Sequence, residues 1–270
     1  MYLSSSTCCT GAADMATPLL SLHDLVIHIP ERESGEPLDL AVHPGQCWGI
    51  LGPNGVGKTT LLHTLAGLRA PRRGSVRLAG TRLAELGRQA VARRMALVFQ
   101  DHHDGFPATV LETALIGRHP YLRAWDVESP EDLAIARGAL ARVDLAHLEH
   151  RLIATLSGGE RQRLAIATAL TQTPELYLLD EPTNHLDLHH QSRVLALIHE
   201  EVARDGAAVL SLHDVNLAAR HCDHLLLLYP DGQACWGATD RMLVPEALER
   251  LYGQRLARGQ VGGVPIFIPH

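Results

Sequence analysis

Four apolar runs along the chain are continuous, without the alternation of polar and apolar residues that marks a half-exposed strand. They cover residues 47–51, 96–99, 176–179 and 207–212. Continuous short runs of this kind are typical of strands buried on both faces of a parallel sheet. Ligands of such sheets collect at the carboxyl ends of the strands, so the polar residues that follow each run are candidates for a functional site.

Shorter runs on either side of these strands predict additional β-structure. Three of them, separated by turns that contain Pro and Gly, are residues 22–29, 38–42 and 74–78. They predict a small antiparallel layer beside the main sheet. Residues 225–229 and 233–236, joined by a Pro-Asp-Gly turn, predict a hairpin. A short helix at 245–252 and a final strand at 265–268 complete the predicted elements.

Between residues 101 and 170 the strand pattern disappears and helical signals replace it. Ser129 is a typical helix N-cap, because a proline and two acids follow it directly. We therefore predict a helical insert at about residues 101–170. Residues 1–18 are small and polar. They are expected to be either a disordered tail or an over-extended start whose true initiator is Met15, which leaves one folded domain over residues 19–270.

The composition excludes several classes of protein. Of the 270 residues, 46% are hydrophobic and 20% charged, which excludes a largely disordered chain. Lys and Arg number 24 against 30 Asp and Glu, and the resulting net charge of −6 argues against a nucleic-acid partner held by a broad basic face. No apolar run reaches the roughly 20 residues that a membrane-spanning helix needs.

A phosphate-binding loop follows the first of the buried strands. Its residues match the pattern GxxxxGK[ST] in full: Gly52, Pro53, Asn54, Gly55, Val56, Gly57, Lys58 and Thr59. The glycines let backbone N–H groups curl around phosphates at the start of a helix. We expect Lys58 to neutralise phosphate charge, Thr59 to ligate Mg²⁺, and Thr60 to join the loop in binding a nucleotide.

The strand at 176–179 delivers two acids at its carboxyl end. Asp180 is the natural second ligand of Mg²⁺, and Glu181 is placed to act on an attacking water. A strand that ends in acids is common on its own. Together with the phosphate loop, this pair predicts a nucleotide hydrolase.

A second anion-binding element stands shortly before that strand. Ser157, Gly158 and Gly159 open a helix within the run LSGGERQR, and one phosphate loop cannot serve both elements. With these motifs in this order, the chain resembles the ATP-binding subunits of ABC transporters from about residue 19 to the end. The resemblance implies an α/β fold, namely a P-loop NTPase with a RecA-like core, an N-terminal antiparallel β layer and a helical insert subdomain.

The same resemblance implies roles for individual residues. Gln100 is the Q-loop residue, which senses Mg²⁺ and the attacking water. Glu181 is the general base and His213 contacts the γ-phosphate of ATP. Asp187 lies in the D-loop, the short segment that follows the two acids.

A head-to-tail homodimer is also implied, in which each ATP lies between Lys58 of one subunit and Ser157 and Gly159 of the other. One position departs from the family. Its members stack adenine on an aromatic residue near the end of the first strand, where this chain has only apolar residues and a histidine. His28 or Ile29 is expected to take that place.

Softer features resemble the group of importers for iron-siderophore complexes, haem and cobalamin. They are the segments 106–112 with 117–120, 183–187 with 190–191, and 244–248 with 251–253. The resemblance implies integral membrane permease subunits as partners, a substrate-binding protein indirectly, and a peripheral location on the cytoplasmic face of the inner membrane. An exporter cassette and a soluble non-transport ABC ATPase stay open as alternatives, and the chain does not identify the cargo.

Residues 100–121 are the expected docking surface for the permease. They combine Gln100 with the apolar side chains Phe106, Pro107, Pro120 and Tyr121. Exposed apolar residues on a loop are typical of such a surface.

Overall fold

The computed structural model describes residues 17–29, 35–99 and 107–269. Its central sheet has the strand order β10-β9-β3-β8-β7-β6. The strands are β3 (Cys47–Leu51), β6 (Met95–Val98), β7 (Leu176–Asp180), β8 (Ala207–Ser211), β9 (His224–Leu228) and β10 (Ala234–Ala238). All four continuous apolar runs are strands of this sheet, and each end lies within one residue of the predicted end.

Parallel pairing aligns the carboxyl ends of the central strands. β3 pairs in parallel with β8 and β9, and β7 pairs in parallel with β8 and β6, whereas β10 runs antiparallel to β9. Strands far apart in the sequence therefore end side by side. The segments that follow β3, β7 and β8, which carry most of the expected site, meet at one edge of the sheet.

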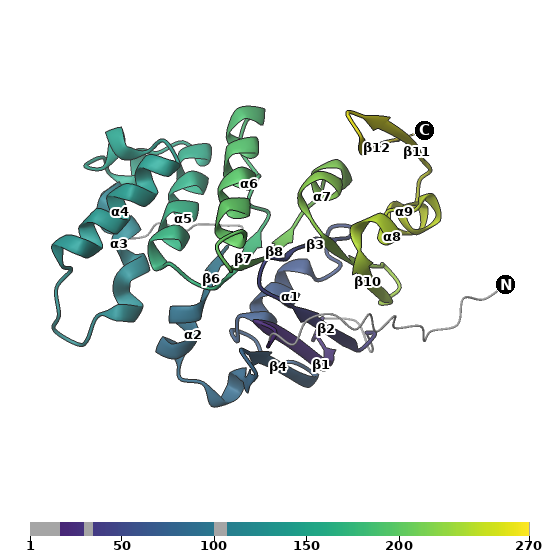
Figure 1. The fold of residues 1–270 in the computed structure, drawn as a ribbon, viewed down its shortest axis with the longest axis horizontal. Helices are drawn as coiled ribbons and strands as arrows, with labels where there is room; N and C mark the ends of the chain where they lie inside the picture. The colour runs from purple at the N-terminus through teal and green to yellow at the C-terminus, as the bar shows by residue number, and fades with distance from the viewer. Residues whose placement is uncertain (1–16, 30–34, 100–106, 270) are drawn as a thin grey trace.

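A second, antiparallel sheet lies below the central one in Figure 1. Its strands, in the order β2-β1-β4-β5, are β2 (Leu38–Val42), β1 (Leu20–Val26), β4 (Arg73–Leu78) and β5 (Thr81–Arg82). Helix α1 (Lys58–Leu65) packs between the two sheets, because its Leu61 and Leu62 are fully buried among side chains of both. Burial of that apolar surface holds the start of α1 at the end of β3.

Helices cover the other face of the central sheet and extend beyond its β6 edge (Figure 1). They are α3 (Val110–Leu115), η2 (Ile116–Tyr121), α4 (Pro130–Arg142), η3 (Ala146–Leu148), η4 (Ile153–Thr155), α5 (Gly158–Gln172), α6 (Leu188–Val202) and α7 (Val215–His221). Ser129 caps α4 as predicted, in a reciprocal pair of hydrogen bonds with Asp132. The helical subdomain expected at about residues 101–170 stays a prediction as a separate unit, and its first residues lie outside the described part of the chain.

Three further segments complete the described chain. η1 (Leu83–Glu85) and α2 (Arg88–Arg94) connect the small sheet to β6. At the other end, α8 (Thr239–Met242) and α9 (Pro245–Tyr252) precede a hairpin of β11 (Leu256–Val261) and β12 (Val264–Pro269). The sequence pattern predicted α9 and β12 but missed β11, whose side chains are almost all exposed and so lack the alternation of a half-buried strand. Within the described ranges, no helix combines the length and the apolar character that crossing a membrane requires.

Candidate functional site

The phosphate loop joins β3 to α1 in a conformation that requires glycine at two positions. At Gly52 an added Cβ would lie 2.6 Å from the carbonyl oxygen of Leu228, so the loop can pass only without a side chain. Gly57 caps α1 with φ of 111°, in the left-handed region that favours glycine. The loop thus brings backbone N–H groups to the start of a helix, where anions bind favourably.

Lys58 is buried beside this loop and is held by it. Its Nζ donates hydrogen bonds to the carbonyl oxygens of Gly52 (2.8 Å) and Pro53 (3.3 Å). Burial lowers the pKa of Lys58, while the nearby charges of Glu181 and Asp180 act to raise it. The ammonium group therefore lies within electrostatic reach of both acids, although they follow a different strand.

A cleft of about 610 Å³ opens over the loop and collects the expected residues. It is lined by Ile29, Asn54, Gly55, Gly57, Lys58, Thr59, Thr60, Glu181, Asn184 and His213. Of the two residues expected in place of an adenine-stacking aromatic, Ile29 lines the cleft, whereas His28 is exposed and does not. The structure thus favours an aliphatic contact at that position.

Asp180 lies at the fully buried end of β7, and one of its oxygens is suited to a cation. Its Oδ1 accepts a hydrogen bond from the Ser211 hydroxyl. Its Oδ2 is buried and has no hydrogen-bond partner among the described residues. A buried carboxylate oxygen without a donor is the kind of ligand that Mg²⁺ prefers, and Thr59, a second oxygen ligand, lines the cleft together with Glu181, the residue after Asp180.

Glu181 is held from two sides at the mouth of the same cleft. Asn184 donates a hydrogen bond to its Oε2, and Nε2 of His213 contacts its Oε1. The backbone N–H of Glu181 donates to the Ser211 hydroxyl (2.8 Å). The sequence placed Asn184 in the D-loop with Asp187 but predicted no contact with Glu181, and Ser211, two residues before the expected His213, had no assigned role. Gln100, the remaining expected catalytic residue, lies outside the described residues.

A second cleft, of about 560 Å³, lies at the start of α5. It is lined by Ser157, Gly158, Gly159, Glu160, Arg163, His185, Leu186, Asp187 and His190. Ser157 is the N-cap of α5, and an added Cβ at Gly159 would lie 3.0 Å from the carbonyl oxygen of His185. The expected D-loop residue Asp187 caps α6 through the backbone N–H of His190, and this hydrogen bond lowers the pKa of Asp187. The two clefts have no lining residue in common.

A third hollow, an apolar groove of about 490 Å³, lies between the end of α1, η1, α2, β6 and the end of α5. It is lined by Ala66, Gly67, Leu68, Leu83, Leu86, Arg88, Val91, Ala92, Met95, Leu97, Phe99 and Gln172. Leu68 is 59% and Phe99 is 41% exposed, so large apolar side chains face solvent here. We call this hollow the apolar groove.

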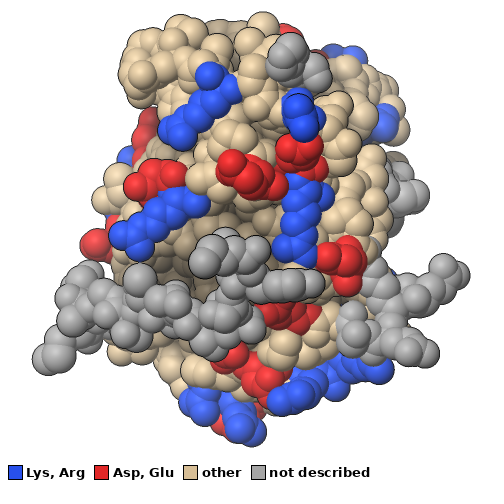
Figure 2. All heavy atoms as spheres, turned by 90° about the vertical axis from the view of Figure 1, so that its right-hand side faces the viewer, with Lys and Arg blue, Asp and Glu red and all other residues tan. Residues whose placement is uncertain are grey.

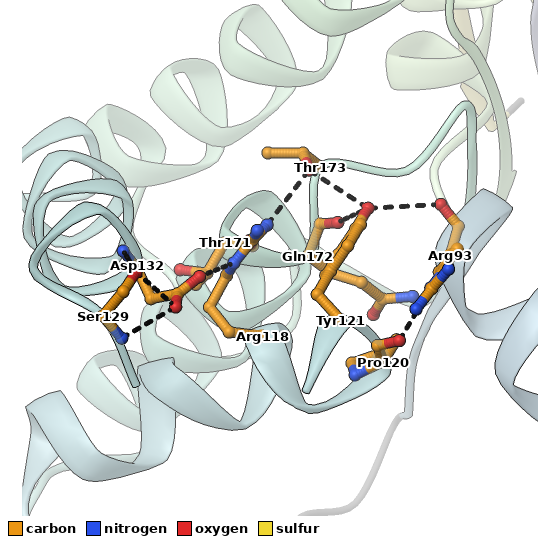
Figure 3. Close-up of polar contacts among 9 residues, drawn as sticks. All are labelled: Arg93, Arg118, Pro120, Tyr121, Ser129, Asp132, Thr171, Gln172 and Thr173. Carbon is orange, nitrogen blue, oxygen red and sulfur yellow. Dashed lines mark hydrogen bonds and ion pairs between the residues drawn. The ribbon is translucent and has the colours of Figure 1, made fainter. Parts of the chain in front are cut away.

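The expectation of an exposed Tyr121 is wrong. Figure 3 shows its ring turned into a polar network, with its hydroxyl bonded to the carbonyl oxygen of Gln172 (3.0 Å) and Arg118 over the ring (4.0 Å). Arg118 in turn pairs with the largely buried Asp132 (2.7 Å). The side chain of Gln172 bonds the carbonyl oxygens of Ala92 and Met95, so this network joins η2, α4 and α5 to the groove wall. Phe106 lies outside the described residues.

Comparisons with known proteins agree with this architecture. Residues 36–184 match the sequence profile of the ABC transporter family. The hemin import ATP-binding protein HmuV of Gloeobacter violaceus is 41% identical over 243 residues, which cover 87% of this chain and 88% of that protein. The cobalamin import ATP-binding protein BtuD of Halobacterium salinarum is 38% identical over 220 residues, 81% of this chain and 55% of that protein.

Solved structures give the same result. A chain of a transporter described as metal-chelate type, in an inward-facing conformation, superposes with a TM-score of 0.81 at 28% identity, covering 94% of this chain and 98% of that one. The expected fold class, a P-loop NTPase with an antiparallel layer and a parallel sheet covered by helices, is confirmed. The profile spans the phosphate loop, Ser157 and the two acids at the end of β7, and the chain therefore belongs to the ABC transporter family, as one of its ATP-binding and ATP-hydrolysing subunits.

Proposed function

We propose that this chain is the subunit that powers a membrane importer, with a cargo of the hemin, cobalamin or metal-chelate type. The names of its relatives, which are hemin and cobalamin import ATP-binding proteins, support import and this class of cargo. One structural observation carries the mechanism. A single chain has two clefts, at the phosphate loop and at the start of α5, that share no residue.

Each ATP lies between two copies of the chain arranged head to tail. The backbone N–H groups from Gly52 to Gly57 and the ammonium of Lys58 hold its phosphates, with Thr59 and Thr60 at the start of α1. Ser157 and Gly159 of the other copy bind the γ-phosphate from the opposite side, with Asp187 close to the contact. This arrangement uses both clefts at once, because each offers N–H groups at a helix start.

Hydrolysis depends on the residues around the buried acids. Thr59, Asp180 and Gln100 would hold Mg²⁺, which neutralises charge on the phosphates when bound. Glu181 accepts a proton from the attacking water, since its carboxylate lines the phosphate cleft and is oriented by Asn184 and His213. His213 also reaches the γ-phosphate from the mouth of the cleft.

The apolar groove is the docking site for an integral membrane permease. Its exposed Leu68 and Phe99 offer an apolar surface larger than isolated surface residues give. Gln172 lines the groove at the end of α5, and Ser157 caps the other end of the same helix. A permease segment bound in the groove is therefore connected by one helix to the cleft at the start of α5. Docking there places the subunit on the cytoplasmic face of the inner membrane, below a substrate-binding protein that delivers cargo to the permease.

Purification of the tagged chain with its permease, followed by transport in vesicles, tests this function. We expect ATP-dependent uptake of one cargo among hemin, cobalamin and iron chelates, and loss of uptake when Glu181→Gln replaces the wild type. A Leu68→Asp variant should lose the permease but keep the ATPase activity of the isolated subunit. ATP-driven efflux would instead identify an exporter, and a subunit that purifies without any membrane protein would contradict the transport function.

A further inference from the structure

The basic residues of this chain are concentrated in one segment. Residues 69–94 hold eight arginines and a single acid, Glu85, so the segment has a formal charge of +7. The whole chain carries −6, which leaves −13 on all other residues. A separation of charge on this scale is typical of a surface that meets an anionic partner.

The segment forms one edge of the molecule, beside the apolar groove. It runs from the end of α1 through β4, β5 and η1 to α2, along the bottom of Figure 1, and Figure 2 shows Lys and Arg side chains at the bottom of the molecule with acidic side chains beside them. We call it the basic edge. Its exposed arginines are Arg69, Arg72, Arg73, Arg82, Arg88, Arg93 and Arg94.

Two arginines of the basic edge face each other across neighbouring strands. Arg77 on β4 and Arg82 on β5 are direct partners in the antiparallel register, so their side chains lie on the same face of the small sheet. Like charges in this arrangement destabilise a sheet. Arg77 donates to the carbonyl oxygen of Gly80 (3.0 Å), a neutral acceptor that does not cancel the charge. An anion bound across Arg77 and Arg82 would cancel that charge.

The charge of the surfaces at the membrane decides which anion the basic edge binds. The groove walls include Leu83, Arg88 and Val91 of the same segment, so a permease seated in the groove brings the basic edge to the membrane. Cytoplasmic loops of membrane proteins carry an excess of Lys and Arg, and such loops repel this edge. The lipids of a cytoplasmic leaflet are anionic and attract it.

We propose that the basic edge binds the anionic headgroups of the membrane around the permease. This inference rests on the proposed docking of the groove, because that docking sets which edge faces the lipid. The contact orients the subunit and adds to its affinity for the membrane. It weakens as salt rises, because ions screen exposed charges beyond about 10 Å at 0.1 M.

Co-sedimentation of the isolated subunit with lipid vesicles tests the inference without a permease. We expect binding to vesicles of phosphatidylcholine mixed equally with phosphatidylglycerol, no binding to pure phosphatidylcholine, and release by salt. The variant R69Q/R77Q/R82Q should bind the mixed vesicles roughly 10- to 100-fold more weakly, since each basic side chain near an anionic surface contributes up to about fivefold.

A control with the same change in net charge separates a located surface from general attraction. The variant R123Q/R241Q/R258Q removes three exposed arginines outside the segment and should bind the mixed vesicles as the wild type does. Equal loss in both variants, or equal binding to both kinds of vesicle, would overturn the inference, as would binding of duplex DNA in preference to the vesicles.

The two proposals fail in different ways. Absence of vesicle binding while the permease still co-purifies through the groove removes only the lipid contact. Vesicle binding by a chain that associates with no permease removes the docking proposal and, with it, the place of the lipid contact beside a permease. If the triple variant does not fold, the double variant R69Q/R82Q, which keeps Arg77 and its hydrogen bond to Gly80, replaces it in the vesicle assay.

Discussion

The Ser211 hydroxyl donates a hydrogen bond to Asp180 at the buried end of β7, and the same oxygen accepts the backbone N–H of Glu181. One side chain from β8 therefore fixes both acids at the carboxyl end of β7. It also supports the backbone of Glu181, whose φ of 49° lies in the left-handed region. Ser211 is thus a positioning residue for the two acids.

Replacing Ser211 by alanine tests this role. Ser211→Ala leaves Asp180 and the N–H of Glu181 without a buried partner, at a cost of about 1–3 kcal/mol in the free energy of unfolding. We expect a higher Mg²⁺ concentration for half-maximal ATPase activity, and Ser211→Thr should restore part of it. Ser192→Ala on the exposed face of α6 is the matched control. An unchanged Mg²⁺ titration for Ser211→Ala would show that the hydroxyl serves stability alone.

The role of Glu181 as general base predicts a separation of binding from hydrolysis. Glu181→Gln keeps the shape of the side chain but cannot take up a proton, so hydrolysis should fall by about 10²- to 10⁴-fold while ATP still binds. Lys58→Ala should weaken ATP binding itself, because it removes the ammonium beside the phosphate loop. Turnover measurements and fluorescence titration with ATP distinguish the two effects. Near-normal turnover by Glu181→Gln would contradict its assignment.

The two-cleft arrangement predicts that ATP joins two copies of the chain. Glu181→Gln protein should change from monomer to dimer when ATP and Mg²⁺ are added, as measured by light scattering. Adding Ser157→Arg should abolish the change, because the larger side chain occupies the place of the γ-phosphate. Gln254→Arg, which adds the same charge at an exposed position, should dimerise normally. A mass that does not respond to ATP would argue against the shared site.

The buried pair of Arg118 and Asp132 predicts a loss of stability in acid. The N–H of Ser129, the guanidinium of Arg118 and the Ser129 hydroxyl together lower the pKa of Asp132 from 3.8 to about 2. Because the pKa of Asp132 is lower in the folded chain than in the unfolded chain, its carboxylate stabilises the fold at pH values above the unfolded pKa. This stabilisation disappears as the pH falls from 3.8 to about 2.

Denaturant unfolding at several pH values measures that contribution. Relative to Asp132→Asn, the wild type should lose stability across this acid range and keep a constant difference above it. Arg118→Ala should be more severe at neutral pH, about 3–5 kcal/mol, because it leaves a largely buried carboxylate without its cation. Parallel pH profiles for wild type and Asp132→Asn would contradict the assignment.

Local sequence determined the parts of this protein that depend on neighbours in the chain. The phosphate loop was predicted in full because its glycines encode a backbone path, and a Cβ added at Gly52 or Gly57 would lie within 2.7 Å of another atom. Ser129 was predicted as a helix cap for the same reason, since a cap and its partner lie three residues apart. The strands at 38–42 and 47–51 were predicted with their exact bounds, because a buried strand shows in the sequence as an apolar run.

Only the tertiary structure decided which distant side chains meet. Ser211 reaches Asp180 because β8 lies beside β7, and no spacing along the chain shows the order of strands in a sheet. Tyr121 was expected at the surface, but the ends of α2 and α5 offer its hydroxyl carbonyl acceptors from segments far away in the sequence. Ile29 rather than His28 lines the cleft, and both follow the end of β1 at Val26, so no strand alternation in the sequence showed which side chain turns inward.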